Sequence, residues 1–180
     1  MSDLSQAARR FVVHWGEMGS RWGVNRSVAQ IHALLYLAPE PKNAEEIADT
    51  LLLARSNVST SLKELQSWGL IRTAHRLGDR RDHFEAIADP WDLFRRILEE
   101  RKRREIDPTL EALEACLEEA GGRRNDERHV KERLEAMRDF FRTVDGWYRK
   151  VSGLPTPAVR RFVELGEGLR GLLGRKRGTG

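Results

Sequence analysis

The stretch Ala54-Arg-Ser-Asn-Val-Ser-Thr-Ser-Leu-Lys-Glu-Leu-Gln-Ser-Trp-Gly-Leu70 decides which fold we expect for this chain of 180 residues. On a helical wheel Val58, Leu62 and Leu65 fall on one narrow stripe, which predicts a helix packed inward on that side. The other side is dense in hydroxyl and amide groups. Ser, Thr and Asn have lower helix propensity than the Glu, Lys, Gln and Ala that suit a merely solvated helix. The pattern therefore indicates a face used for recognition through hydrogen bonds.

Duplex DNA is a target that suits this face. When the N-terminal half of a helix enters the major groove, Asn can pair with adenine, Arg with guanine, and Ser or Thr with bases or phosphate. The alternative is an amphipathic helix with N-terminal capping residues, but capping explains one or two of the polar residues and not the whole run. We therefore expect DNA contacts from Arg55, Ser56, Asn57, Ser59, Thr60 and Lys63.

Periodicity and turn signals place this helix within a series of elements. Asn43-Ala-Glu-Glu46 has the capping-box pattern and opens a short helix before it. Gly69 is placed to end the helix as a C′ glycine, and a turn at Leu77–Arg81 separates two short strands. This order is typical of a winged helix-turn-helix. The expected ranges are Asp3–Met18, Ser27–Leu37, Asn43–Leu51, Arg55–Trp68, Leu70–Arg76 and Asp82–Ile87.

The hairpin adds basic residues next to the helix. From Arg55 to His83 there are six Lys or Arg against three acids, whereas Glu105–Ala120 holds six acids and no Lys or Arg. Such a hairpin reaches phosphates or the minor groove. The alternative is a solvated hairpin in which Asp79 and Asp82 pair with some of the arginines. We expect further DNA contacts from Arg72, Arg76, Arg80 and Arg81.

The rest of the chain is predicted to be helical, so the fold class is mainly α. A helix from Trp91 to about Arg104 is expected to be interrupted or kinked at Asp107-Pro108 and to continue to Glu119, before a break at Gly121-Gly122. Two more helices are expected at Glu127–Lys150 and Pro157–Leu173. The predicted organisation is an N-terminal dimerisation helix at 1–24, a winged DNA-binding domain with a two-stranded wing at 25–89, a helical dimerisation region at 90–173 and a disordered tail at 174–180.

Three apolar stripes predict a homodimer. Each has no obvious partner within a small winged-helix core, and helices of this kind commonly bury such faces across a twofold axis. The alternative is that they cover their own subunit. The stripes are Leu4, Ala8, Phe11 and Trp15; Leu134, Met137, Phe140, Phe141 and Val144; and Val159, Phe162, Val163 and Leu169.

Composition limits the remaining classes. The net charge is +4 and Cys116 is the single cysteine, which excludes an intrachain disulfide and suits the cytoplasm. We expect neither a signal peptide nor a membrane span. The five histidines are scattered and no catalytic motif is present, so we expect no enzyme and no cofactor. His75 and His83 facing each other across the hairpin would make only a weak metal site, and we expect none.

Three segments together resemble the MarR-type regulators, and more narrowly their GbsR-like branch. They are Ala54–Leu70 as quoted above, Met18-Gly-Ser-Arg-Trp-Gly23 and Ala29-Gln-Ile-His-Ala-Leu-Leu-Tyr-Leu37. The likeness covers about Phe11–Ile87. It implies a winged-helix dimer whose terminal helices form the dimer body, and a wing in which Asp79 pairs with Arg80 or Arg81.

The turn before the recognition helix departs from the usual pattern. It is Leu52-Leu53-Ala54, without the usual Gly and Ser. A Leu in the left-handed conformation is costly, so either the turn has another geometry or the preceding helix overruns. The residue that caps the recognition helix therefore stays open.

The resemblance also implies a small effector, since some relatives respond to choline-type quaternary ammonium compounds. Such a cation needs aromatic faces around it. Glu17 or Asp145 would supply the opposite charge. The alternative is that the rings serve core and interface packing. The candidate cage residues are Trp15, Trp22, Trp91, Trp147 and Tyr148.

We therefore expect a cytoplasmic, sequence-specific DNA-binding regulator, a repressor, that acts as a homodimer on a pseudo-palindromic operator. The alternative function is a winged-helix protein-interaction adaptor without specific DNA binding, because fold alone does not exclude it. A hydroxyl-rich, basic helix argues against the adaptor, since protein interfaces favour aromatic and Met residues at their centre.

Overall fold

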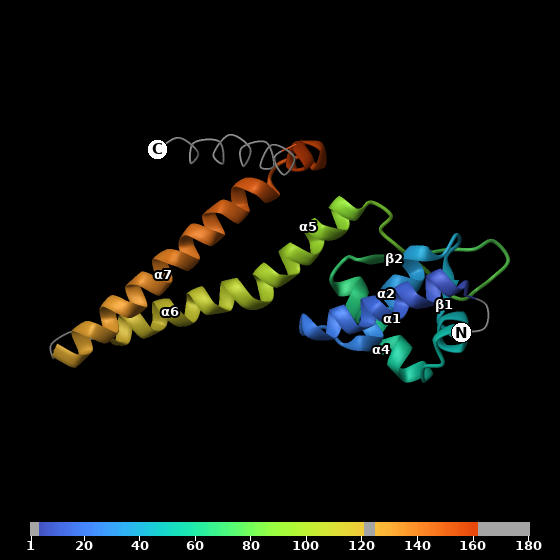
Figure 1. The fold of residues 1–180 in the computed structure, drawn as a ribbon, viewed down its shortest axis with the longest axis horizontal. Coiled ribbons are helices and arrows are strands. Elements are labelled where there is room, and N and C mark those ends of the chain that lie inside the picture. The colour runs from blue at the N-terminus through green and yellow to red at the C-terminus, as the bar shows by residue number, and fades with distance from the viewer. Residues whose placement is uncertain (1–3, 121–124, 162–180) are drawn as a thin grey trace, which may run out of the picture. The chain divides into compact units, whose positions relative to one another are not determined.

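The computed structural model describes residues 4–120 and 125–161, with side chains from 128 onward in the second range (Figure 1). It divides into two compact units, Met1–Ile97 and Leu98–Gly180. Within the described residues, no helix is both long and apolar enough to cross a membrane.

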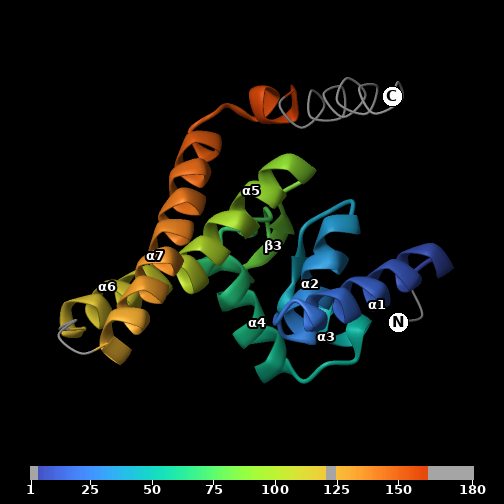
Figure 2. The ribbon, with the colours of Figure 1, turned by 60° about the vertical axis from the view of Figure 1, so that its left-hand side comes forward.

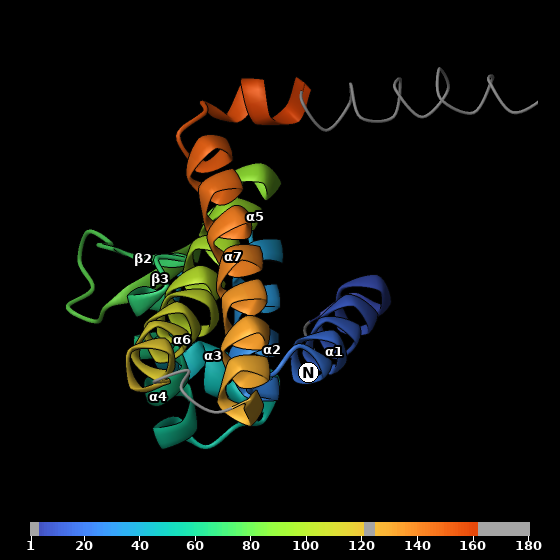
Figure 3. The ribbon, with the colours of Figure 1, turned by 90° about the vertical axis from the view of Figure 1, so that its left-hand side faces the viewer.

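The first unit is a winged helix-turn-helix, as the sequence predicts. Four helices gather in one cluster, in which α2 contacts α1, α3 and α4 (Figure 2). The hairpin of β2 and β3 extends its loop away from these helices (Figure 3). The elements are α1 (Gln6–Arg21), α2 (Arg26–Leu37), β1 (Lys42–Asn43), α3 (Ala44–Leu51), α4 (Arg55–Ser67), β2 (Ile71–Ala74), β3 (His83–Ala86) and the start of α5 (Pro90–Arg101).

The sheet has one strand more than the sequence predicted. Its antiparallel order is β1-β3-β2, with Lys42 opposite Phe84 and Asn43 opposite His83. Two residues are too few to show an alternating pattern, so β1 has no sequence signal. It connects the segment before α3 to the base of the wing.

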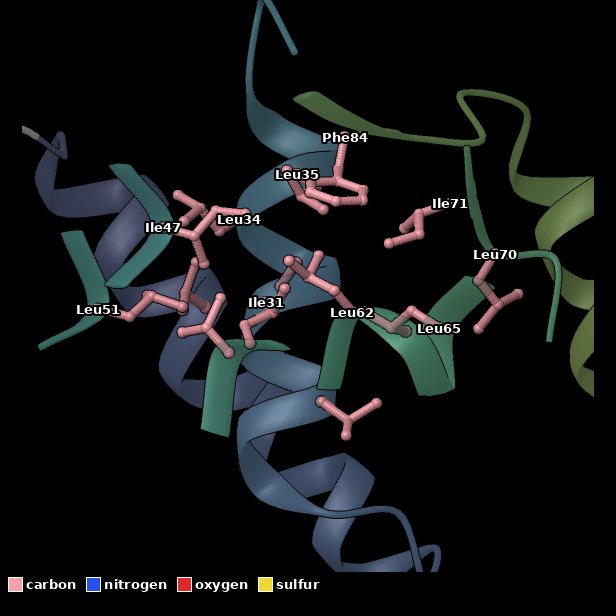
Figure 4. Close-up of a cluster of buried hydrophobic side chains, with 14 of the residues drawn as sticks. Ile31, Leu34, Leu35, Ile47, Leu51, Leu62, Leu65, Leu70, Ile71 and Phe84 are labelled. Carbon is pink, nitrogen blue, oxygen red and sulfur yellow. The ribbon is translucent and has the colours of Figure 1, made fainter. Parts of the chain in front are cut away.

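The core of this unit lies between α2, α3, α4 and the sheet (Figure 4). The predicted inward stripe of α4 is confirmed, because Val58, Leu62 and Leu65 are all buried. Burial of such side chains stabilises the fold by roughly 1.5–3 kcal/mol each. It also turns the opposite face of α4 outward. Their partners include Ile31, Leu34, Ile47, Leu51, Ile71 and Phe84.

Two of the predicted helix ends are confirmed. Asn43 caps α3, with its Oδ1 accepting from the backbone N–H of Glu45 and Glu46, while the Glu46 carboxylate accepts from the Asn43 N–H at 2.7 Å. Gly69 follows α4 with a φ of +64°, and a Cβ there would run into the Arg96 guanidinium. Both helix ends depend on hydrogen bonds and backbone conformations of nearby residues, so the sequence shows them directly.

The turn before α4 follows neither of the two alternatives that the sequence left open. Leu52 itself adopts the left-handed conformation, with φ 57° and ψ 43°. Its side chain is 80% exposed, while Leu53 packs against the core and its N–H bonds the Ala48 carbonyl at 3.0 Å. The burial of Leu53 therefore holds its neighbour in a strained backbone. Ala54 is the N-cap residue of α4, and no side chain caps that helix.

The second unit is a helical hairpin that follows α5. A π-helical turn, η1 (Lys102–Ile106), precedes α6 (Asp107–Glu119), and α7 (Asn125–Ser152) runs beside α6 (Figure 3). The interruption expected at Asp107-Pro108 takes the form of this π turn, which accommodates a proline that lacks an N–H.

Residues 156–161 begin a further helical segment. The greater part of the helix predicted at Pro157–Leu173 lies outside the described residues. So do the stripe positions Phe162, Val163 and Leu169 and the tail predicted to be disordered at 174–180.

Candidate nucleic-acid interface

The outward face of α4 presents a short polar surface. Ser56, Ser59, Thr60 and Lys63 are all exposed. The Thr60 hydroxyl donates to the Ser56 carbonyl at 3.0 Å, and within the described part of the chain Lys63 makes no ion pair. This face therefore offers hydroxyl groups and one cation to a ligand.

Asn57 differs from these residues because both ends of its amide are engaged inside the protein. Its Nδ2 donates to the Ser27 hydroxyl oxygen at 2.9 Å, and its Oδ1 accepts from the buried Ser61 hydroxyl at 3.3 Å. The side chain is only half exposed. Asn57 thus connects α4 to the first turn of α2, through a partner thirty residues away in the chain.

The wing arginines are exposed but mostly paired. Arg72 Nε donates to Glu85 at 2.6 Å, and Arg76 Nη2 donates to Glu40 at 2.7 Å. Arg80 makes no ion pair with any described residue. Exposed pairs of this kind are weak, so phosphate can compete for these arginines.

Asp79 and Arg81 form the wing pair that the family resemblance implies. Arg81 Nη2 and Nε donate to the carboxylate at 2.6 and 2.9 Å, and the Arg81 backbone N–H donates to it at 3.0 Å. These bonds hold the pKa of Asp79 well below its ordinary value and raise the pKa of Arg81. The buried His83 lies beneath, with its Nδ1 donating to the Arg81 carbonyl at 3.0 Å.

Glu45, near the start of α3, joins the wing to α4. Its Oε2 accepts from Arg81 Nη1 at 3.1 Å, and its Oε1 accepts from Arg55. The hydrogen bonds from Arg81 and then Arg55 lower the pKa of the Glu45 carboxyl. Asp79, Arg81, Glu45 and Arg55 therefore form one chain of ion pairs across the wing, α3 and α4.

A hollow of about 240 Å³ lies at the base of the wing, next to His75, Arg76 and His83. His75 is exposed, whereas His83 is buried and bonded to Arg81. Among the described residues, no group of three or more His, Cys, Asp or Glu side chains is arranged to hold a metal ion.

Comparison with known proteins agrees with this geometry. Residues 22–82, which span α2, α3, α4 and most of the hairpin, match the MarR family. This winged part of the chain is therefore similar to MarR-family regulators. The predicted resemblance to MarR-type regulators is thereby confirmed, and its GbsR-like part is confirmed by the relative described next.

Two individual proteins are similar to this chain over most of its length. The HTH-type transcriptional repressor GbsR of Bacillus subtilis (strain 168) is 21% identical over 169 residues, covering 90% of this chain and 93% of the relative. A crystal structure described as that of a transcriptional regulator has a TM-score of 0.65 and 23% identity, over 82% of this chain and 96% of that chain. The latter shows the same fold.

The candidate effector residues do not share one environment. In the first unit Trp15 stacks on Phe11 and His32, at centroid distances of 5.3 and 6.3 Å, while Trp22 is exposed and Trp91 is half-buried. In the second unit Trp147 is exposed, and the face of Tyr148 carries the Lys102 ammonium at 5.8 Å. Lys102 also pairs with Asp145 at 3.1 Å.

Sequence reasoning missed Ser27 and Glu45. Ser27 lies in the first turn of α2, and Glu45 lies inside the capping box, where Glu46 accounts for the visible pattern. Their partners are thirty and thirty-six residues away, so no local signal marks either residue.

Proposed function

We propose that this chain is a MarR-type regulator, a homodimeric repressor of the cytoplasm that binds a pseudo-palindromic operator in duplex DNA. The observation that carries the proposal is the exposed hydroxyl face of α4 beside an arginine-bearing wing. In this fold the recognition helix enters the major groove and the wing contacts the backbone or the minor groove. Repression is supported by the name of the B. subtilis relative, a transcriptional repressor.

The proposed contacts divide by chemistry. Ser56, Ser59 and Thr60 are exposed on α4 and would contact base edges, while Asn57 would hold the helix in position through its bond to Ser27. The cations would bind phosphate, since Lys and Arg contacts to the backbone give affinity without sequence information. These cations are Arg55, Lys63, Arg72, Arg76, Arg80 and Arg81.

The proposed dimer uses terminal helices, with 1–24 and 90–173 as dimerisation segments around a DNA-binding domain at 25–89. The stripe in 1–24 also covers its own subunit, the alternative that the sequence left open, because Leu4, Phe11 and Trp15 pack against the core. Support comes from an apolar face on α7, where Met137, Phe140 and Trp147 are each about half exposed. Their spacing of three and seven residues places them on one seam of the helix, the pattern by which helices associate. An unpartnered face of this kind is unusual on a monomer.

Light scattering at micromolar concentration tests the dimer, because a monomer has a mass of 20.7 kDa. We expect twice that mass for the wild type and a shift toward monomer for the Phe140→Glu, Trp147→Glu double variant. The matched control is Arg128→Gln with Lys150→Gln, two exposed positions on α7 away from the seam, which lowers the net charge by the same two units. A wild type that stays monomeric at high micromolar concentration contradicts the proposed dimer.

Operator binding is tested by gel shift and fluorescence anisotropy with DNA flanking the protein's own gene. Thr60→Ala should cost about 1–3 kcal/mol at one base position, whereas Lys63→Ala should weaken binding to all sequences alike. Equal wild-type affinity for this DNA and for random duplexes at several salt concentrations would favour the protein-interaction adaptor instead.

Control by a quaternary ammonium effector remains part of the proposal. The support in the second unit is that the Lys102 ammonium lies over the Tyr148 ring and pairs with Asp145, so groups that bind a cation are present there. Choline and glycine betaine can be titrated while Trp fluorescence and melting temperature are followed. No response at millimolar ligand would contradict a role for Trp15, Trp22, Trp91, Trp147 and Tyr148 in binding such a cation.

A further inference from the structure

We infer that Glu45 is an intramolecular competitor for DNA phosphate: its carboxylate occupies donors of Arg55 and Arg81 in the free protein and thereby lowers affinity for DNA of every sequence. The inference rests on the proposed function, because it concerns the same arginines. It assigns to an acidic residue of α3 the role of setting how strongly the winged helix holds the DNA backbone.

The geometry places one carboxylate between the two DNA-facing elements. Arg55 is the first residue of α4 and Arg81 lies in the wing, and their side chains are 73% and 56% exposed. Each oxygen of Glu45 accepts from a different arginine, at Oε1 from Arg55 and at Oε2 from Arg81. Two anionic oxygens bridging two guanidinium groups are the arrangement that a phosphate group would offer them.

The hydrogen-bond donors of Arg81 are divided between two acids: Asp79 positions the side chain, and Glu45 competes with DNA phosphate for it. Asp79 takes Nε, Nη2 and the backbone N–H of Arg81, which fixes the guanidinium on the wing. Nη1 donates to Glu45 at 3.1 Å. Nη1 is therefore the side-chain nitrogen that Asp79 leaves available to a DNA phosphate, and it is the one that Glu45 occupies.

The charges support competition and not a structural role. Glu45 neutralises one of the two arginine charges and Asp79 the other, so a phosphate must displace Glu45 to reach both guanidinium groups. Glu45 is 41% exposed in its side chain, and α3 is already capped by Asn43 and Glu46. Solvent-exposed pairs are weakly held and readily exchanged.

The opposite interpretation is that Glu45 orients both arginines for DNA, as Asp79 orients Arg81. The two interpretations predict changes of opposite sign. Removing a competitor strengthens DNA binding, whereas removing a positioning residue weakens it.

The test is Glu45→Gln in the whole 180-residue chain, which keeps the side-chain shape and removes the charge. Affinity is measured by anisotropy on a random-sequence duplex and on the operator fragment, across a salt series. We expect three- to thirty-fold tighter binding to both duplexes, and a slope of log affinity against log salt that is larger in magnitude by about one.

Two variants with the same change of net charge serve as controls. Asp49→Asn lies on α3, exposed and without an ion pair among the described residues, so it reports the effect of net charge alone. Asp79→Asn should weaken binding despite its added positive charge. In a background of Arg55→Ala with Arg81→Ala, the gain from Glu45→Gln should fall to that of Asp49→Asn.

Gains for Glu45→Gln no greater than for Asp49→Asn, or a loss of affinity with unchanged melting temperature, would overturn the inference. A wild type that binds neither duplex at low salt would overturn the proposed function, and this inference with it. If the wild type binds DNA and Glu45→Gln binds it with the same affinity, the inference is overturned and the proposed function is not.

Discussion

The side-chain nitrogen of Asn57 donates a hydrogen bond of 2.9 Å to the hydroxyl oxygen of Ser27, and this bond fastens α4 to the first turn of α2. The other end of the same amide accepts from Ser61, which is buried. A polar group left without its partner in such a place costs more than the bond itself contributes. The orientation of the recognition helix thus depends on a contact outside its own sequence.

Asn57→Ala should therefore lower the free energy of unfolding by about 1–3 kcal/mol, because Ser61 loses its acceptor and Ser27 loses its donor. Urea denaturation of Asn57→Ala, Ser27→Ala and the double variant measures the coupling, expected at about 0.5–3 kcal/mol for residues in contact. Ser59→Ala, an exposed change on the same helix, should stay within about 0.5 kcal/mol. If Asn57→Ala were as stable as Ser59→Ala yet lost base preference, Asn57 would be a base-reading residue.

Leu52→Gly should stabilise the protein by about 0.5–1 kcal/mol. Leu52 has a φ of 57°, and a left-handed non-glycine residue costs roughly 1–2 kcal/mol. Glycine avoids this cost, but its greater conformational entropy in the unfolded chain cancels part of the gain in stability. Leu52→Ala is the matched control, since it removes the exposed side chain but keeps the Cβ that causes the strain. Equal stability of the Gly and Ala variants, measured by thermal unfolding, would show that the backbone at this turn is not strained.

Gly19→Ala should destabilise the first unit by about 1–3 kcal/mol, the usual range for overpacking. A Cβ at Gly19 would lie 2.6 Å from the Cβ of Ala29, so α1 would have to move away from α2. Ala29→Gly in the same chain should recover part of the loss. At Gly16 the new Cβ would meet the flexible side chain of Gln30, so Gly16→Ala should cost less. No rescue by Ala29→Gly would contradict this contact.

The buried His32 should make stability depend on pH in mildly acidic solution. It stacks between Trp15 and Tyr36, and burial lowers the pKa of His32 from 6.5 to about 4. Between these values the unfolded chain binds the proton and the folded chain does not, so the free energy of unfolding falls as pH falls. Above pH 6.5 both states are neutral and this dependence ends.

The expected loss is about 2 kcal/mol between pH 6.5 and 5, from the value of one pKa unit. Urea denaturation across this range measures the free energy of unfolding at each pH. His32→Phe should flatten the pH profile, whereas His14→Phe, on the exposed side of α1, should leave it unchanged. Below about pH 4 a different loss of stability begins, because the pKa of Asp79 is lowered by Arg81 and its carboxylate stabilises the fold only while ionised. An unchanged slope in His32→Phe would contradict the assignment.

Patterns that act over a few residues carried the fold prediction. The spacing of Val58, Leu62 and Leu65 placed α4 and its outward face, the Asn43–Glu46 box placed α3, and Gly69 placed the end of α4. Helix periodicity and capping depend on neighbours within one or two turns, so the sequence shows them directly. The winged fold and the choice of candidate DNA residues on α4 followed from these patterns.

Contacts between distant residues were decided by the tertiary structure alone. Burial of Leu53 against the core held Leu52 in a conformation that its own propensity disfavours, and packing of α4 on α2 turned Asn57 toward Ser27. The bridge from Arg81 to Glu45 spans thirty-six residues of chain. Such pairs form because folding brings their elements together, and the free energy of burying the core exceeds the local cost at each position.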